Sequence, residues 1–141
     1  MKHKLILFVF FACGGITTEV FFTAIRQFFD GTGDLRMTGH SYIWMFPLYG
    51  IAALLFPPAI HKMKQLNLIL RASIYATGIF LVEFIAGAAL EFITGVCPWK
   101  YSGGMHVLGY IRLDYFPFWA IFGFVIENII FGYEKLFGVR V

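Results

Sequence analysis

Long apolar stretches, separated by short polar or turn-forming segments, divide the chain into four parts. A run of about 20 such residues can cross the roughly 30 Å hydrocarbon layer of a membrane as a helix. The pattern therefore predicts an all-α membrane protein with four transmembrane helices, over about residues 5–29, 41–60, 68–93 and 113–133.

Prolines modify two of these helices. Pro57-Pro58 lies near the end of the second helix and predicts either a kink or an early stop at Phe56, because proline lacks the N–H group that continues the helical ladder. Pro117 falls in the first turns of the fourth helix, where proline is tolerated.

The two halves of the chain repeat each other. A shift of 64 positions (83 − 19) aligns Gly14 with Gly78, Glu19 with Glu83, Gln27 with Glu91 and Phe28 with Phe92. After a second loop that is longer by six residues, a shift of 70 (109 − 39) aligns Gly39 with Gly109, Phe46 with Phe116 and Pro47 with Pro117. We therefore expect one integral membrane domain over 1–141, built from two helix hairpins over about 5–60 and 68–133.

The helix number of each repeat also predicts its orientation. A two-helix unit returns to the side where it began, so the repeats are parallel and related by an axis along the membrane normal. Lys and Arg concentrate on the cytoplasmic side of membrane proteins. Both termini and the middle loop are therefore expected to be cytoplasmic, given the positions of Lys2, Lys4, Lys62, Lys64, Lys135 and Arg140.

Composition supports this assignment. Hydrophobic residues make up 60% of the chain and charged residues only 13%, whereas soluble domains are about 45–50% apolar and 25% charged. The net charge of +3 resides at helix ends and forms no basic stripe, so we expect membrane lipids as partners and no nucleic acid. The expected location is the plasma (inner) membrane. The N-terminal segment resembles a signal peptide, but its apolar run continues through Phe29, which predicts a retained first helix.

Polar residues form matching stripes on the first and third helices. Helical spacing places Glu19, Thr23, Arg26 and Gln27 on one face of the first helix. It places Glu83, Gly87 and Glu91 on the matching face of the third helix. One interpretation is an outward-opening cleft in which Glu19 and Glu83 bind a cation or proton; the other is hydrogen bonding between helices. Arg26 and Glu91 are placed to pair across the axis. Glu127, deeper in the fourth helix, is expected to join a polar cluster or to pair with Lys or Arg.

The second outer loop, 95–113, is denser in chemistry than a simple connection requires. Trp99 and Tyr101 fit an interfacial aromatic belt; alternatively, the loop folds as a lid over the cleft. The sequence contains no nucleotide-binding loop, serine triad or zinc motif. We therefore expect no enzymatic activity, no cofactor and no metal.

Several segments together resemble a known family. They are Glu83-Phe84, Cys97-Pro98-Trp99 with Tyr101-Ser102, and Gly109 to Tyr115 with Trp119. Over about residues 10–130 they are similar to the ABC-transporter type IV permease-like family of small bacterial membrane proteins and to the animal transmembrane protein 229 group. The family pattern has Asp at the position of Lys100 and Trp at that of Val82. The resemblance implies the four-helix topology and transport.

These observations predict a transporter- or permease-like protein with an outward-facing polar cleft built on Glu19 and Glu83. The expected binding residues are Glu19, Glu83, Arg26, Gln27, Glu91, Trp99 and Tyr101. Four helices enclose little space, so we expect a homo-oligomer or a larger membrane complex, with a lipid, small solute or cation in the cleft. The alternative is a non-catalytic accessory or assembly subunit of a larger membrane complex.

Overall fold

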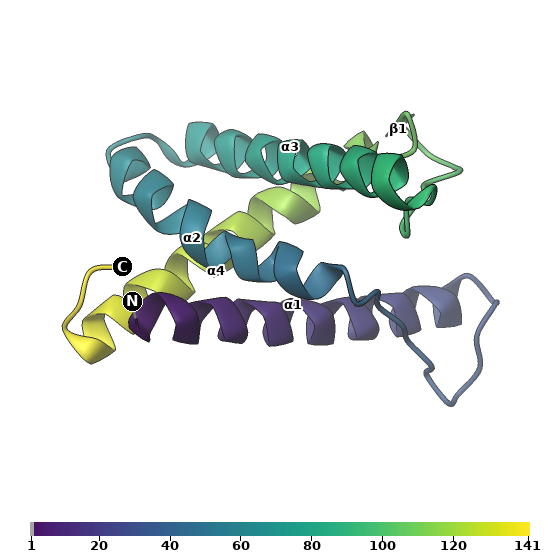
Figure 1. Cartoon of the computed structure of the whole chain (residues 1–141), viewed down its shortest axis with the longest axis horizontal. Helices are drawn as coiled ribbons and strands as arrows, with labels where there is room; N and C mark the ends of the chain where they lie inside the picture. The colour runs from purple at the N-terminus through teal and green to yellow at the C-terminus, as the bar shows by residue number, and fades with distance from the viewer. Residues whose placement is uncertain (1) are drawn as a thin grey trace. The chain divides into compact units, whose positions relative to one another are not determined.

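The computed structural model describes residues 2–141 (Figure 1), and over these residues the regular structure is mainly helical, with two long connections between the helices. Its helices are α1 (Lys2–Phe29), α2 (Met45–Met63), α3 (Leu68–Thr94) and α4 (Phe116–Phe137). Between α3 and α4, the short strands β1 (His106–Val107) and β2 (Ile111–Arg112) pair antiparallel and lead into a 3-10 turn, Leu113–Tyr115. The all-α prediction is confirmed, apart from this small β-hairpin in the second outer loop.

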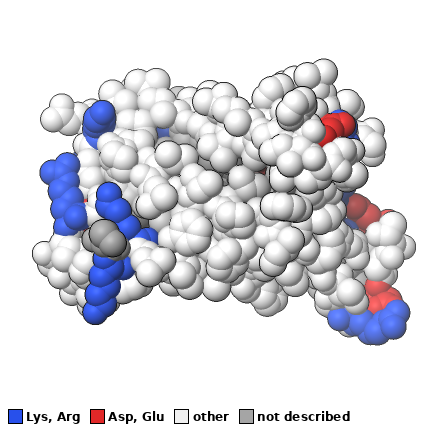
Figure 2. All heavy atoms as spheres, in the orientation of Figure 1, with Lys and Arg blue, Asp and Glu red and all other residues white. Residues whose placement is uncertain are grey.

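Within residues 2–141, three helical segments are long and apolar enough to cross a membrane: Lys2–Phe29, Leu68–Thr94 and Leu113–Phe137. The chain is therefore an integral membrane protein. Charged residues occupy only a small part of the face shown in Figure 2. The second helix is not one of the three. It has 19 residues, and its last turn contains His61 and Lys62, which lower its mean hydropathy.

Helix α2 passes through both of its late prolines. It continues beyond Pro57 and Pro58 to Met63, so the early stop at Phe56 is wrong. Proline fixes φ near the helical value, and each proline removes only one backbone hydrogen bond. Pro57 is fully buried, so packing holds the helix together where its ladder is weakened.

The chain divides after Pro58 into two compact units, each containing one helix hairpin. In the first unit, Tyr49 of α2 packs against Gly15 of α1; in the second, Tyr75 of α3 packs against Gly123 of α4. A Cβ atom on either glycine would overlap the facing tyrosine, so both glycines allow close helix contact. The predicted pair of hairpins is confirmed, and the axis relating them stays a prediction.

Local signals fix the ends of α3 and α4. The Asn67 side chain caps α3 by accepting a hydrogen bond from the Leu70 N–H at 2.9 Å. The C-cap of α3 is Gly95 and that of α4 is Gly138, both with left-handed backbone (φ 77° and 61°). Pro117 lies in the first turn of α4, as predicted.

Candidate functional site

Glu19 joins three parts of the first unit. Its Oε2 atom accepts hydrogen bonds from the Ser41 hydroxyl at 2.9 Å and the Tyr49 hydroxyl at 3.1 Å. Ser41 belongs to the connection between α1 and α2, residues 30–44, here called the first outer loop. Tyr49 belongs to α2, and the contact of its ring with Gly15 positions its hydroxyl group. Glu19 is half-buried, so this acid of α1 holds both the loop and the second helix of its hairpin.

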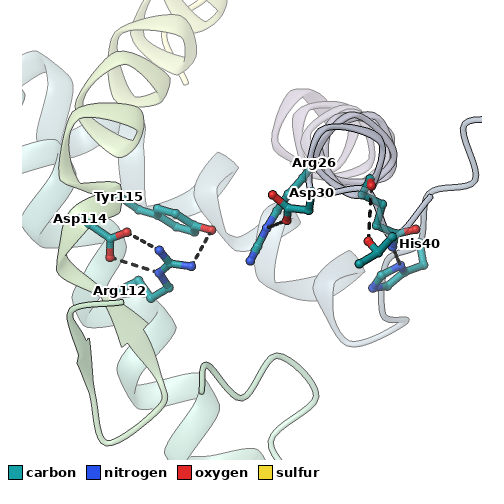
Figure 3. Close-up of polar contacts among 8 residues, drawn as sticks. Arg26, Asp30, His40, Arg112, Asp114 and Tyr115 are labelled. Atoms are coloured by element: carbon teal, nitrogen blue, oxygen red, sulfur yellow. Dashed lines mark hydrogen bonds and ion pairs between the residues drawn. The ribbon is translucent and has the colours of Figure 1, made fainter. Parts of the chain in front are cut away.

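The first outer loop covers the next turns of the same stripe. The Thr23 hydroxyl donates to the His40 carbonyl at 2.9 Å and accepts from the His40 N–H at 2.8 Å (Figure 3). Gln27 Nε2 lies 3.2 Å from His40 Nδ1. A Cβ atom at Gly39 would overlap the Val20 carbonyl, so glycine lets the loop rest directly on α1. The polar stripe of α1 is therefore the docking surface for its own loop.

Arg26 lies outside the part of α1 that the first outer loop covers, and its side chain is about half exposed. It forms an ion pair with Asp30 one turn further along, at 3.3 Å (Figure 3). Glu91, the partner expected from the sequence, belongs to the second unit. The pairing of Arg26 with Glu91 stays a prediction.

The second outer loop covers the stripe of α3 in a similar way. Next to Gly87 lie the Tyr110 ring and the Cys97 sulfur, in ordinary or tight van der Waals contact with the position a Cβ would occupy. Lys100 Nζ pairs with Glu91 Oε2 at 2.5 Å. A hydrogen bond to Glu91 also raises the pKa of Tyr110. Loop residues thus cover this stripe from Gly87 to Glu91.

Glu83 begins the same stripe, one turn before Gly87, and is half-buried on α3. Its negative charge acts on the Cys97 thiol and raises its pKa, a smaller effect than burial. The predicted approach of Glu83 to Glu19 would join the two units and stays a prediction.

The aromatic residues of this loop pack within the loop itself. Trp99 is buried, and its Nε1–H donates to the Tyr110 carbonyl at 3.2 Å. Tyr101 is half-buried, its backbone N–H donates to Gly109, and its ring meets Tyr115 edge to face at 5.9 Å. The dense sequence of this segment therefore encodes a folded loop.

Arg112 fastens this loop to the start of α4 (Figure 3). Its guanidinium donates to both carboxylate oxygens of Asp114 and to the Tyr115 hydroxyl. It also lies 4.4 Å from the Tyr115 ring centroid and 6.0 Å from that of Tyr101. The β-hairpin is thus tied to the helix by one cation that combines hydrogen bonds with cation–π contacts.

The loops that lie over the polar stripes of the two units contact them through equivalent residues. Gln27 and Glu91 are 64 positions apart, and their partners His40 and Tyr110 are 70 apart, the same shifts that align the repeats. The duplication therefore extends to contacts between side chains. The first outer loop contacts its stripe through the hydrogen bonds of His40 with Thr23 and Gln27. The second outer loop adds an ion pair, that of Glu91 with Lys100.

The most buried acidic side chain lies outside the two polar stripes, on α4. Among the described residues, Glu127 is the buried charged side chain, at 8% exposure. It accepts hydrogen bonds from the Arg71 guanidinium and the Tyr75 hydroxyl, both on α3. The expected pairing of Glu127 with a basic residue is confirmed. Tyr75 was not identified from the sequence, although its i, i+4 spacing from Arg71 places both on one face of α3.

A second pair in the same unit was also missed. His61 Nε2 lies 2.9 Å from Glu134 Oε1, and both side chains are largely buried. His61 belongs to the end of α2 and Glu134 to the last turns of α4. No spacing rule links residues 73 positions apart, so this contact carries no sequence signal.

Burial also governs the chemistry of Cys97. It raises the pKa of this thiol, and the thiolate is the reactive form. In a Cys13→Ser protein, we expect Cys97 to react with a water-soluble maleimide at least about tenfold more slowly than an exposed cysteine, near neutral pH. The control carries Cys13→Ser, Cys97→Ala and Ser102→Cys, whose single thiol lies on the exposed part of the same loop. Equal rates would show that the loop does not bury Cys97.

Two apolar hairpins with hydrogen-bonded acids define a small helical membrane protein. The family described as "Putative ABC-transporter type IV" matches residues 6–137, and the chain belongs to this family. The resemblance seen in the sequence is thus confirmed. No solved structure matches the chain.

Proposed function

We propose that the chain is a permease-like membrane protein in which Glu19 and Glu83 bind a cation or proton in an outward-facing polar cleft. Membership of the family supports a role in transport. The observation that carries the proposal is the arrangement around Glu19, where Ser41 and Tyr49 both donate to Oε2 of a half-buried carboxylate in an apolar helix.

The chemistry of this arrangement suits a small cation. A carboxylate in the middle of a membrane helix costs roughly 3 kcal/mol, and the two hydroxyl donors offset part of that cost. Carboxylate and hydroxyl oxygens are also the ligands that hard cations prefer. The hydrogen bonds of Glu19 that are described use Oε2, which leaves Oε1 for a bound proton or cation.

The proposal is tested by measuring flux in liposomes that contain the purified protein. Proton and potassium fluxes are followed with a pH-sensitive dye and a potassium electrode. We expect Glu19→Gln to lower the flux about tenfold or more, because the amide keeps the shape of the side chain but loses its charge. Asp30→Asn is the matched control, since this acid is exposed beyond the end of α1. Unchanged flux in a folded Glu19→Gln protein would contradict the proposal.

The second candidate is an accessory subunit of a larger membrane complex. It is favoured by Glu127, whose hydrogen bonds serve to join α3 to α4, and by large exposed aromatic side chains such as Phe29 at 80% and Phe92 at 92%. This role predicts stoichiometric purification with other subunits from the native membrane. Isolation of the chain alone, with flux intact, would exclude it.

A further inference from the structure

One face of α4 exposes a continuous row of side chains. The row, here called the α4 seam, consists of Phe118, Ile121, Val125, Asn128 and Gly132. Their spacing alternates between three and four residues, the pattern of a helix–helix seam. Helix α4 buries different residues, Gly123, Ile126, Glu127 and Ile130. Of these, Gly123 and Glu127 contact Tyr75 of α3. The seam is therefore separate from the contact of α4 with α3.

Asn128 is the polar member of this apolar row. Its Nδ2 donates to the Phe124 carbonyl in its own helix at 2.8 Å. This bond uses one of two N–H donors and leaves the side-chain carbonyl oxygen available. Asn128 lines a groove of about 480 Å³ together with Ile121, Phe124, Val125 and Ile129. An exposed carboxamide inside a membrane-spanning segment requires a polar partner.

Gly132 makes the seam suitable for close packing. It lies one turn beyond Asn128 on the same face, and a Cβ atom there would meet no atom within 4 Å. Small residues at such positions let two membrane helices approach closely, and polar side chains then bond across the interface. A small residue one turn from an exposed Asn is thus the chemistry of a helix–helix interface within a membrane.

We propose that the α4 seam is the interface of a symmetric dimer of this chain. The distribution of Lys and Arg predicts one membrane orientation for all copies, which places Asn128 at the same depth in each. Across a twofold axis along the membrane normal, the residue then meets its own counterpart. Asn can donate and accept at once, so two copies satisfy each other. The inference goes beyond the proposed function, because it assigns a partner surface on a helix that does not carry Glu19 or Glu83.

The first test is disulfide cross-linking in liposomes of purified protein. Both native cysteines are replaced (Cys13→Ser, Cys97→Ala) and one new cysteine is introduced. We expect Ile121→Cys to form a covalent dimer upon mild oxidation. The matched control is Ile85→Cys, because Ile85 of α3 is about as exposed as Ile121 (58% and 64%). Absence of a dimer with Ile121→Cys, or equal cross-linking at both positions, would overturn the proposal.

The second test measures the dimer dissociation constant by fluorescence energy transfer between labelled copies in detergent. Asn128→Leu is expected to raise this constant about three- to tenfold, the range of hydrogen bonds between membrane helices. Asn128→Gln should restore much of the affinity, because it keeps both donor and acceptor. The described hydrogen bond of Asn128 lies within α4, so the helical circular dichroism of both variants should equal that of the parent. Unchanged dimerisation of Asn128→Leu would overturn the assignment.

Discussion

Replacing Glu127 with leucine is expected to lower the free energy of unfolding by about 3–5 kcal/mol, the range for removal of one partner from a buried ion pair. Glu127 is 8% exposed and receives hydrogen bonds from Arg71 and Tyr75. Without it, a largely buried guanidinium and a buried hydroxyl lose their acceptor. The pair joins α3 to α4, so the whole second hairpin should loosen.

The measurement is thermal unfolding in detergent, followed by circular dichroism. A second variant, Glu127→Leu with Arg71→Met, removes both charges and should recover part of the loss, because an apolar pair can replace a buried ion pair at little cost. The control is Asp34→Asn, which removes an exposed pair with Arg36 and should change little. If Glu127→Leu unfolds at the same temperature as Asp34→Asn, the buried pair does not stabilise the hairpin.

Gly15→Ala is expected to destabilise the first hairpin by about 1–3 kcal/mol, the usual cost of overpacking. The new methyl group would overlap the Tyr49 ring. If the ring moves away, its hydroxyl group leaves Glu19, which would also disturb the site proposed for transport. The loss should appear both as a lower unfolding temperature and as reduced flux.

The adjacent residue provides the control for this prediction. A Cβ atom at Gly14 would meet no atom within 4 Å. Gly14→Ala should therefore leave stability unchanged or raise it by up to about 1 kcal/mol, because alanine favours helix over glycine. Equal effects of the two substitutions would show that Tyr49 does not pack against Gly15.

Helices with uninterrupted apolar runs could be predicted closely from the sequence. Helix α3 was expected over 68–93 and spans Leu68–Thr94, because Asn67 and Gly95 mark its ends. Helix α2 was predicted less well: it begins at Met45, four residues later than expected (45 − 41), and continues past the prolines to Met63. Prolines favour an end of the helix there, whereas side-chain packing favours its continuation. Pro57 is fully buried and the helix continues, so packing outweighs the effect of the prolines.

The candidate site was predictable along each helix but not between segments. Spacing identified the stripes of Glu19 and Glu83, because residues four apart share a helix face. It could not show that His40 rests on Thr23, nor that Tyr110 covers Gly87, since loops have no periodicity to fix their register. The contact of His61 with Glu134 could not be predicted either, because it joins two helices at positions 73 residues apart in the sequence.

The adjacent prolines of α2 affect the mechanics of the chain. They coincide with the point where it passes from one unit to the other, after Pro58. Without N–H groups at 57 and 58, the carbonyls at 53 and 54 receive no helical hydrogen bond. Two of the hydrogen bonds that would resist bending of α2 there are therefore missing, and a bend at this point leaves the contacts of Glu19 and Glu127 within their own units intact. This stretch is expected to be the least stiff part of α2.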